Sequence, residues 1–326
     1  MNKYVKKGLC LVLATGLIAS SFAGCAKVNY VTEGAIKAIH QIKDGSWKKQ
    51  AEGEKAGSSE DTSVLEKSFE AGKYGGVEFK SLEDVANYYK EAYDYTKTLT
   101  AEYVNDKGQT ETFYKFLGDE KINVGKVMID GKENAVINKL VPGIVDGLFK
   151  PNIYGLVPCN NRNPKLDNYN CNEKDPGKKD FRKSYVKGED VLDANITDNG
   201  DGTITMVIQP KAAEMSMRGE DSQGDFFEVL GDISATVAQI DVISFAQGTA
   251  EDNIKVTYKG GTVTCTINTK TKEITKAEYD MVAEVAVNHA NVAVIKDKSA
   301  SLLIKYKNTF PASDEVTMKA RQFKRK

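Results

Sequence analysis

The sequence predicts an α+β fold, in which a long curved antiparallel sheet (a meander) carries helices packed on one face. Two observations predict it. From residue 191 onward, segments of alternating apolar and polar residues dominate the chain, and this is the period of half-buried strands. Most segments before that point carry apolar residues at the three-to-four spacing of helices. A sheet with one wet face, covered on the other face by the earlier helices, satisfies both patterns.

The first 24 residues have the composition of a secretory signal. Lys3, Lys6 and Lys7 form a basic start without any acid, and the apolar run Leu9–Ala19 follows. Such a run, followed by small residues, is typical of a cleaved export signal. It is too short for a good membrane-spanning helix.

The end of this signal, Phe22-Ala23-Gly24-Cys25, resembles a bacterial lipobox, where small residues stand directly before a cysteine. The resemblance implies diacylglycerol transfer to the Cys25 thiol, cleavage before Cys25 and, in some bacteria, acylation (palmitate) of its amine. Phe22 departs from the usual leucine but stays apolar, and a plain signal peptide is the alternative. Two acyl chains hold a protein firmly at a bilayer. We therefore expect a lipid-anchored protein on the extracytoplasmic face of the cell membrane.

Composition divides the chain into a lipoprotein signal peptide (1–24), a lipid-anchored tether with short helices (25–80) and an α+β domain (81–326). A further boundary near residue 183 is an alternative. Within the tether, Thr32–Lys43 has helical spacing, the polar run 45–62 suits a flexible spacer, and Val64–Ala71 can form another short helix.

The domain begins with the most regular helical pattern in the chain. Ser81 and Asp84 resemble a capping box, and apolar positions follow at helical spacing as far as Thr96. Four tyrosines lie on this helix, at positions 88, 89, 93 and 95. A sugar or cofactor platform is one interpretation. We favour a stripe that packs on the sheet with its hydroxyls at the rim.

A β-hairpin is expected next, from Leu99–Val104 and Thr110–Leu117. Glu133–Lys150 has the apolar spacing of a helix, which Pro142 should kink or split. Residues 151–182 contain four of the seven prolines and many asparagines, so we expect a loop.

The second half is predicted to be mainly strands. A helical turn is expected over Phe226–Leu230 and a longer helix over Ile233–Phe245. The expected strands are Val191–Thr197, Thr203–Gln209, Ile254–Lys259, Thr262–Asn268, Ile274–Asn288 and Asn291–Tyr306. Turn-forming residues separate them, such as the run from Asp198 to Gly202.

Cysteine use fits an oxidising compartment. Cys159 and Cys171 enclose an eleven-residue loop, and outside the membrane this spacing suggests a disulfide, which would stabilise the fold by about 3 kcal/mol. A zinc pair is the rival, although no histidine or second cysteine pair is near. A calcium site in the Asn/Asp-rich loop 167–175 is a further alternative. Cys265 is expected to be a buried free thiol on the apolar side of a strand.

No metal motif is complete in the sequence. Asp193, Asn195 and Thr197 have the first spacings of an EF-hand loop. The sixth position is Asp198, where glycine is needed, and the twelfth is Ile204, where glutamate is needed. We therefore expect a turn here, and no metal or cofactor.

Catalytic motifs are equally scarce. The chain has two histidines, His40 in the tether and His289 at an expected turn, and neither has a nucleophile motif around it. We expect no catalytic residue and no enzyme. A carboxylate-based hydrolase remains an alternative because acids are abundant.

Charge also limits the partners. Lys plus Arg is 45 and Asp plus Glu is 46, which argues against a nucleic-acid binder. Removing the signal removes three lysines and no acid, so the net charge changes from −1 to −4. The basic C-terminal end is expected to be a frayed, solvated tail, with contact to anionic lipid or wall polymer as the alternative.

Taken together, the lipobox at Cys25, the helix Ser81–Thr96 and the meander Ile254–Tyr306 resemble surface lipoproteins of monoderm, Firmicutes-type bacteria. The segment Asn268-Thr-Lys-Thr-Lys-Glu-Ile-Thr-Lys-Ala-Glu-Tyr279 resembles the strand–turn–strand unit of half-barrel, lipoprotein-carrier-type proteins. That resemblance implies an apolar cavity for acyl chains and carries no functional residue over. The expected function is a non-catalytic binding protein, possible ligands being a lipid or another hydrophobic molecule. A surface protein with a filled core that binds wall polymer or a protein partner is the second hypothesis.

Overall fold

The structure is a computed structural model that describes residues 61–115, 118–130, 132–133, 155–158, 183–231, 234, 243–292, 295–313 and 323–325. Cys25, Cys159 and Cys171 lie outside the described residues, as does most of the helix expected over 133–150.

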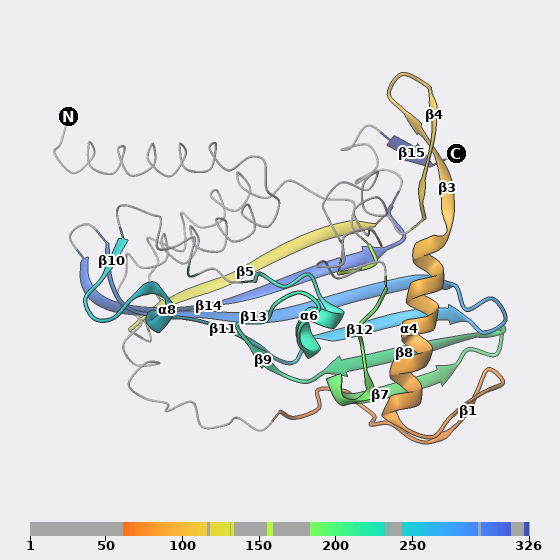
Figure 1. Cartoon of the computed structure of the whole chain (residues 1–326), viewed down its shortest axis with the longest axis horizontal. Coiled ribbons are helices and arrows are strands. Elements are labelled where there is room, and N and C mark those ends of the chain that lie inside the picture. The colour runs from red at the N-terminus through yellow and green to blue at the C-terminus, as the bar shows by residue number, and fades with distance from the viewer. Residues whose placement is uncertain are drawn as a thin grey trace, which may run out of the picture.

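The fold is built on a long antiparallel sheet, and this part of the predicted fold class is confirmed (Figure 1). Two strands dominate it, β13 with 19 residues and β14 with 16. The main path across the sheet is β6 (Lys132–Glu133), β5 (Asp119–Ile129), β14 (Ile295–Phe310), β13 (Ile274–Val292), β12 (Thr262–Asn268), β8 (Thr203–Pro210) and β7 (Val191–Asp198).

Strand β13 is central to the sheet. One of its edges pairs with β14, and the other edge pairs with three shorter strands, one after another along its length. These are β12, β11 (Ile254–Tyr258) and β10 (Ile243–Phe245), and β9 (Ala213–Glu214) pairs with β11. Along this edge of β13, strands β12, β11 and β10 together take the place of one interrupted strand. Between β11 and β12, Gly260 has φ +73°, and a Cβ on Gly261 would lie 2.7 Å from the Asp280 carbonyl oxygen. Glycine is therefore required where the strand is interrupted.

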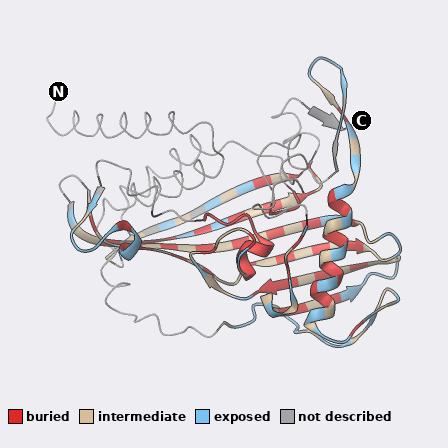
Figure 2. Ribbon diagram, viewed as in Figure 1, coloured by how far each residue is buried: buried red, intermediate tan, exposed pale blue. Residues whose placement is uncertain are grey.

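Burial alternates along the strands as the sequence predicts (Figure 2). On β12, Val263, Cys265 and Ile267 are buried, whereas the threonines between them are half-buried. Cys265 is a buried free thiol, as expected, and burial raises its pKa to about 12. The sheet therefore has a packed inner face and a wetter outer face.

Helix α4 (Leu82–Thr98) confirms the predicted capping box, formed by Ser81 and Asp84. It lies across the sheet in Figure 1, and the Thr96 hydroxyl accepts a 2.8 Å hydrogen bond from the Ile274 backbone N–H. Tyr89 and Tyr93 are buried, as expected for a stripe that faces the interior. Their hydroxyls are buried too, rather than at the rim as expected.

The other described helices are short. They are η2 (Gly188–Asp190), α6 (Ser222–Phe226) and α8 (Ala250–Asn253). The helical turn expected over 226–230 therefore forms four residues earlier, as α6, where the Asp221 side chain caps it. The helix expected over Ile233–Phe245 is wrong at its end, because residues 243–245 pair with β13 as strand β10.

The predicted hairpin is present as β3 (Thr100–Asn105) and β4 (Thr110–Tyr114), but it stands apart from the main sheet (Figure 1). Strand β15 (Phe323–Arg325) pairs with β3 and completes a three-stranded sheet, which we call the arm. The expectation of a frayed C-terminal tail is therefore wrong for residues 323–325, whose backbone the ladder holds.

Residues 61–71, which we call the strap, contact the sheet and form no helix, although one was expected over 64–71. Asp193 accepts hydrogen bonds from the Ser63 hydroxyl (2.5 Å) and the Phe69 N–H (3.0 Å). The Val64 N–H donates to Gln209 Oε1 at 2.7 Å. Because β7 and β8 offer side-chain acceptors to its donors, the strap runs extended along them. The hairpin of β1 (Gly72–Tyr74) and β2 (Val77–Phe79) then leads to α4.

Asp193→Ala should release the strap, because it removes both acceptors. We expect a loss of about 1–3 kcal/mol in the free energy of unfolding and faster proteolysis within residues 61–71. Urea unfolding and limited trypsin digestion measure the two effects. Glu66→Ala, at an exposed strap position, is the matched control.

The same variant has a pH signature. Burial works to raise the pKa of Asp193, but the hydrogen bonds from Ser63, Phe69 and its other donors outweigh it and hold the pKa below its ordinary value of 3.8. A lowered folded pKa means that the carboxylate stabilises the fold at neutral pH and that this stabilisation is lost as pH falls below 3.8. Asp193→Ala should therefore reduce the loss of unfolding free energy that occurs as the pH falls below 3.8, which we call the acid limb. An unchanged acid limb would show that the strap contacts contribute nothing.

Candidate functional site

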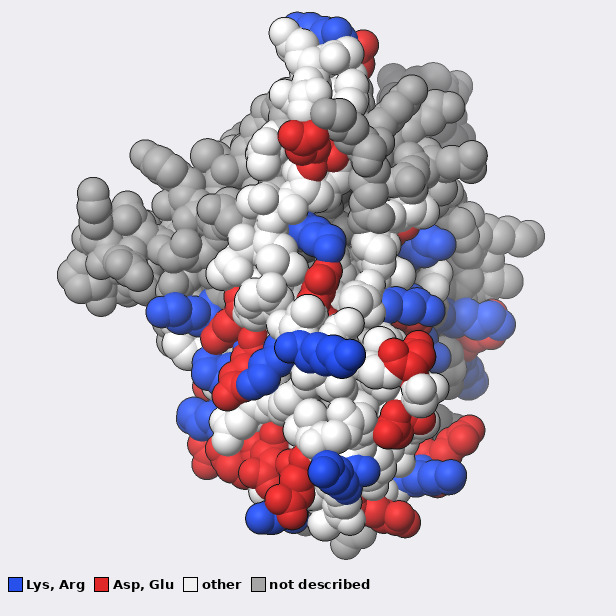
Figure 3. All heavy atoms as spheres, turned by 90° about the vertical axis from the view of Figure 1, so that its right-hand side faces the viewer, with Lys and Arg blue, Asp and Glu red and all other residues white. Residues whose placement is uncertain are grey.

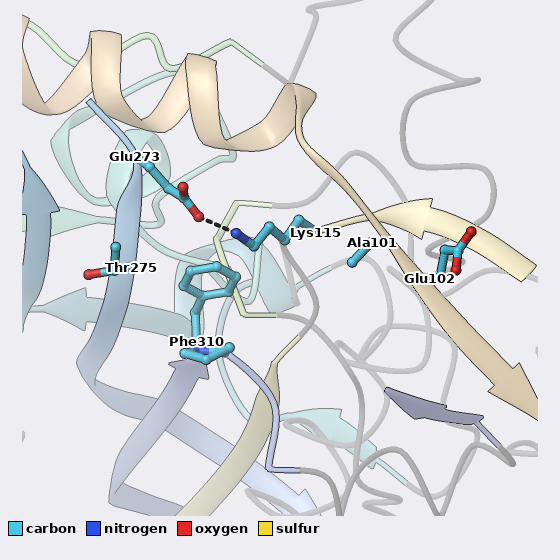
Figure 4. Close-up of a pocket in the computed structure, with 7 residues that line it drawn as sticks. Ala101, Glu102, Lys115, Glu273, Thr275 and Phe310 are labelled. Atoms are coloured by element: carbon cyan, nitrogen blue, oxygen red, sulfur yellow. Dashed lines mark hydrogen bonds and ion pairs between the residues drawn. The ribbon is translucent and has the colours of Figure 1, made fainter. Parts of the chain in front are cut away.

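A pocket lies where the arm meets the end of the main sheet, and we call it the arm cleft (Figure 4). Its volume is about 520 Å³, which is within the range of small-molecule sites. The lining residues come from three places: β3, the end of β4, and the adjoining ends of β13 and β14. They are Ala101, Glu102, Lys115, Glu273, Thr275, Phe310 and Pro311.

An ion pair between Lys115 and Glu273 spans the cleft from the arm to the sheet (Figure 4). Lys115 follows β4, where its backbone N–H donates to the Leu99 carbonyl at 2.5 Å. Glu273 ends the turn between β12 and β13, where its carbonyl accepts from the Asn268 N–H at 2.9 Å. Their side chains are 41% and 22% exposed, so both charges remain within reach of solvent.

The floor of the cleft is apolar. Phe310, the last residue of β14, is buried, and Pro311 follows it. Thr275 lies beside the floor, and its hydroxyl donates to the Thr266 carbonyl at 3.2 Å. A floor of this kind beneath a polar wall suits a ligand that has an apolar body and polar groups.

Charges of both signs surround this end of the molecule, and Figure 3 shows them interleaved. Lys272 pairs with Glu91, and Lys307 pairs with Glu278 at 2.6 Å. The hydrogen bond between Lys307 and Glu278 lowers the pKa of Glu278 and raises that of Lys307, so both stay charged. Because positive and negative side chains are mixed at this end, it does not produce the electrostatic field of one sign that attracts a polyanion.

The interior beneath α4 differs from the cleft because aromatic side chains fill it. Tyr89, Phe226 and Tyr279 are each at most 1% exposed. The Tyr89 and Phe226 rings lie 5.4 Å apart, and the hydroxyls of Tyr89 and Tyr279 are 3.0 Å apart. Burial raises the pKa of Tyr89 well above its ordinary value. This region is therefore a packed aromatic core.

A second pocket, of about 620 Å³, lies beside the β1–β2 hairpin and has Lys73, Glu78 and Lys80 in its lining. Like the arm cleft, it does not lie between α4 and the sheet. These two pockets therefore lie at the edges of the described fold.

The expected turn at His289 is wrong, because β13 continues through it to Val292 with a shifted register. His289 Nδ1 lies 2.8 Å from Asp297 Oδ1, and both residues have φ +51°. No group of three or more His, Cys, Asp or Glu side chains suited to a metal ion occurs in the described part of the chain.

Sequence reasoning missed the central pair of the cleft. Lys115 and Glu273 are 158 residues apart in the chain, and each stands beside a turn where charged residues are ordinary. No local pattern marks them, since only the packing of the arm against the sheet brings them together.

No family model matches the chain, and no curated protein or solved structure is significantly similar to it. Among the described helices, none has the length and apolar character needed to cross a membrane.

Proposed function

We propose that this chain is a membrane-anchored, extracytoplasmic, non-catalytic binding protein that takes its ligand in the arm cleft. The observation that most supports this proposal is the contrast between the cleft, which is open and has a charged wall, and the packed aromatic core beneath α4. An acyl chain needs an apolar cavity, and the tyrosines occupy the described space where one was expected. The second hypothesis, a filled core with surface binding, is therefore favoured over an interior lipid site.

We further infer that α4 and α6 cover the inner face of the sheet at the end where the cleft lies. The contact between Tyr89 of α4 and Tyr279 of β13 supports this, and so does the packing of Phe226 of α6 against Tyr89. This layer stabilises the sheet ends from which the cleft is built.

The hydrolase alternative needs two carboxyls in a cleft, one with a raised pKa. Burial raises the pKa of Asp94 and Asp190, but neither lines the arm cleft. Asp94 accepts from the Ser184 N–H at 2.6 Å, and Asp190 from the Lys187 N–H at 2.7 Å. Both carboxyls therefore have structural partners. Two carboxyls do line the arm cleft, but Glu273 is paired with Lys115, and Glu102 lies on the far side of Ala101 from that pair in Figure 4.

The anchor is tested by Cys25→Ser in the full chain expressed in a monoderm bacterium. We expect loss of palmitate incorporation and a shift of most of the protein from the membrane fraction to the soluble fraction, because the thiol is the group that receives the diacylglycerol and with it two acyl chains. Cys10→Ser, within the signal, should leave both unchanged. Membrane retention of the Cys25→Ser protein would contradict the anchor.

The cleft is tested by Thr275→Trp, which puts a bulky side chain at its lining. Co-sedimentation with purified peptidoglycan sacculi, and separately with phosphatidylglycerol vesicles, measures binding by the mature chain. We expect sacculus binding that Thr275→Trp weakens about tenfold, since the indole occupies the ligand's space. Thr257→Trp is the matched control, because Thr257 pairs with Glu284, nine residues and roughly 30 Å along β13 from Thr275. Binding that survives Thr275→Trp would contradict the proposal, and vesicle binding alone would restore the lipid hypothesis.

A further inference from the structure

The arm cleft carries a positive and a negative group side by side, and this limits which ligands it can favour. Lys115 and Glu273 form a contact ion pair with both side chains partly exposed. In Figure 4, Glu102 lies on the far side of Ala101 from this pair. A ligand with one charge gains from one member of the pair and is repelled by the other, so most of the attraction cancels.

A ligand that carries both charges avoids this cancellation. If its ammonium faces Glu273 and its carboxylate faces Lys115, both contacts are attractive and both are charge-assisted hydrogen bonds. The free ends of one short peptide supply these two groups. Pro311, which is half-buried and follows the buried Phe310, provides an apolar surface for the ligand's side chains.

We propose that the arm cleft selects zwitterionic ligands, namely short peptides with a free ammonium and a free carboxylate and with an apolar side chain. The inference rests on the proposed binding function of the cleft and specifies the chemical class of its ligand. Removing either charge from the ligand, or either member of the pair, should remove one of the two contacts.

The probes are the dipeptide Ala-Phe, its N-acetyl derivative and its C-terminal amide, titrated into the mature chain by calorimetry. We expect each blocked dipeptide to bind about tenfold more weakly than the free one, which is the effect of one lost charge-assisted hydrogen bond. Lys115→Met should bind the free dipeptide and its amide equally. Glu273→Gln should bind the free dipeptide and its N-acetyl form equally.

Lys187→Met is the matched control, because it removes the lysine of an exposed pair outside the cleft, where Lys187 Nζ lies 3.0 Å from Glu189. It should retain full discrimination. Thermal unfolding of each variant shows whether the fold is intact, and discrimination is compared only within one variant, so a general loss of affinity does not imitate the result.

Equal affinity of the wild-type chain for free and blocked dipeptides would overturn the inference, as would the absence of measurable dipeptide binding. Two results separate this failure from failure of the proposed function. If Thr275→Trp abolishes sacculus binding, the cleft remains the binding site and only the ligand class is wrong. If Thr275→Trp leaves both dipeptide and sacculus binding unchanged, the cleft is not the site and both proposals fall.

Discussion

Replacing Tyr279 with alanine is expected to lower the free energy of unfolding by about 3–5 kcal/mol, as for other large buried aromatic side chains. Tyr279 is fully buried on β13, and its hydroxyl lies 3.0 Å from that of Tyr89 on α4. The substitution therefore opens a cavity between helix and sheet and leaves the Tyr89 hydroxyl without this contact. Chemical denaturation by urea, followed by far-UV circular dichroism, measures the change.

Two variants separate the parts of this effect. Tyr279→Phe keeps the ring and should cost only about 1 kcal/mol, the ordinary net value of one hydrogen bond. Tyr95→Ala removes a tyrosine that is 42% exposed on the same helix and should change stability by less than about 0.5 kcal/mol. If Tyr279→Ala cost no more than Tyr95→Ala, the interior beneath α4 would not be a packed core, and the lipid-cavity hypothesis would regain support.

Gly118→Ala is expected to destabilise the fold by about 2–3 kcal/mol, although it adds one methyl group. A Cβ at this position would lie 2.0 Å from the Thr309 carbonyl oxygen and 2.4 Å from the Gly155 Cα. Both neighbours are backbone atoms, so the clash cannot be relieved by rotating a side chain. The chain beside Thr309 or Gly155 must shift instead.

This shift should also reach the arm cleft, because Thr309 directly precedes Phe310 and Pro311 of its floor. We expect weaker sacculus binding together with the lower stability, measured on the same preparation. Gly72→Ala is the control, since its nearest contact is the Tyr74 ring at 3.3 Å, which can move. Wild-type stability for Gly118→Ala would mean that β5 and the segment 155–158 are not packed as closely as the structure shows.

The elements that the sequence predicts well are those with a strong local signal. The alternation of β12 and the capping box of α4 depend on residues a few positions apart, and both are confirmed. Strand β5 was missed because three charged residues begin it and Gly125 interrupts its apolar alternation. The sheet makes it a strand anyway, by pairing it with β14 over residues 300–309.

The candidate site could not be predicted because its parts are distant in the chain. Asp193 is a second example of a residue whose role could not be predicted from its neighbours in the sequence. The sequence offers it as an incomplete calcium ligand, whereas the structure gives it the strap's donors as partners. Which partner a carboxylate finds is decided by tertiary packing, and no local spacing records it.

The position of the strap also has a mechanical consequence for the proposed anchor. With Cys25 held at the membrane as proposed, a pull on the domain is transmitted through residue 61, whose carboxylate accepts from the Ala212 N–H at 2.5 Å. The contacts of Ser63, Val64 and Phe69 with β7 and β8 follow along the chain, so they bear the load next and can break one after another. The long ladder between β13 and β14 lies deeper in the sheet and is loaded only after they fail. With the proposed anchor, we therefore expect the strap contacts to yield under tension before the ends of β13 and β14 at the cleft are loaded.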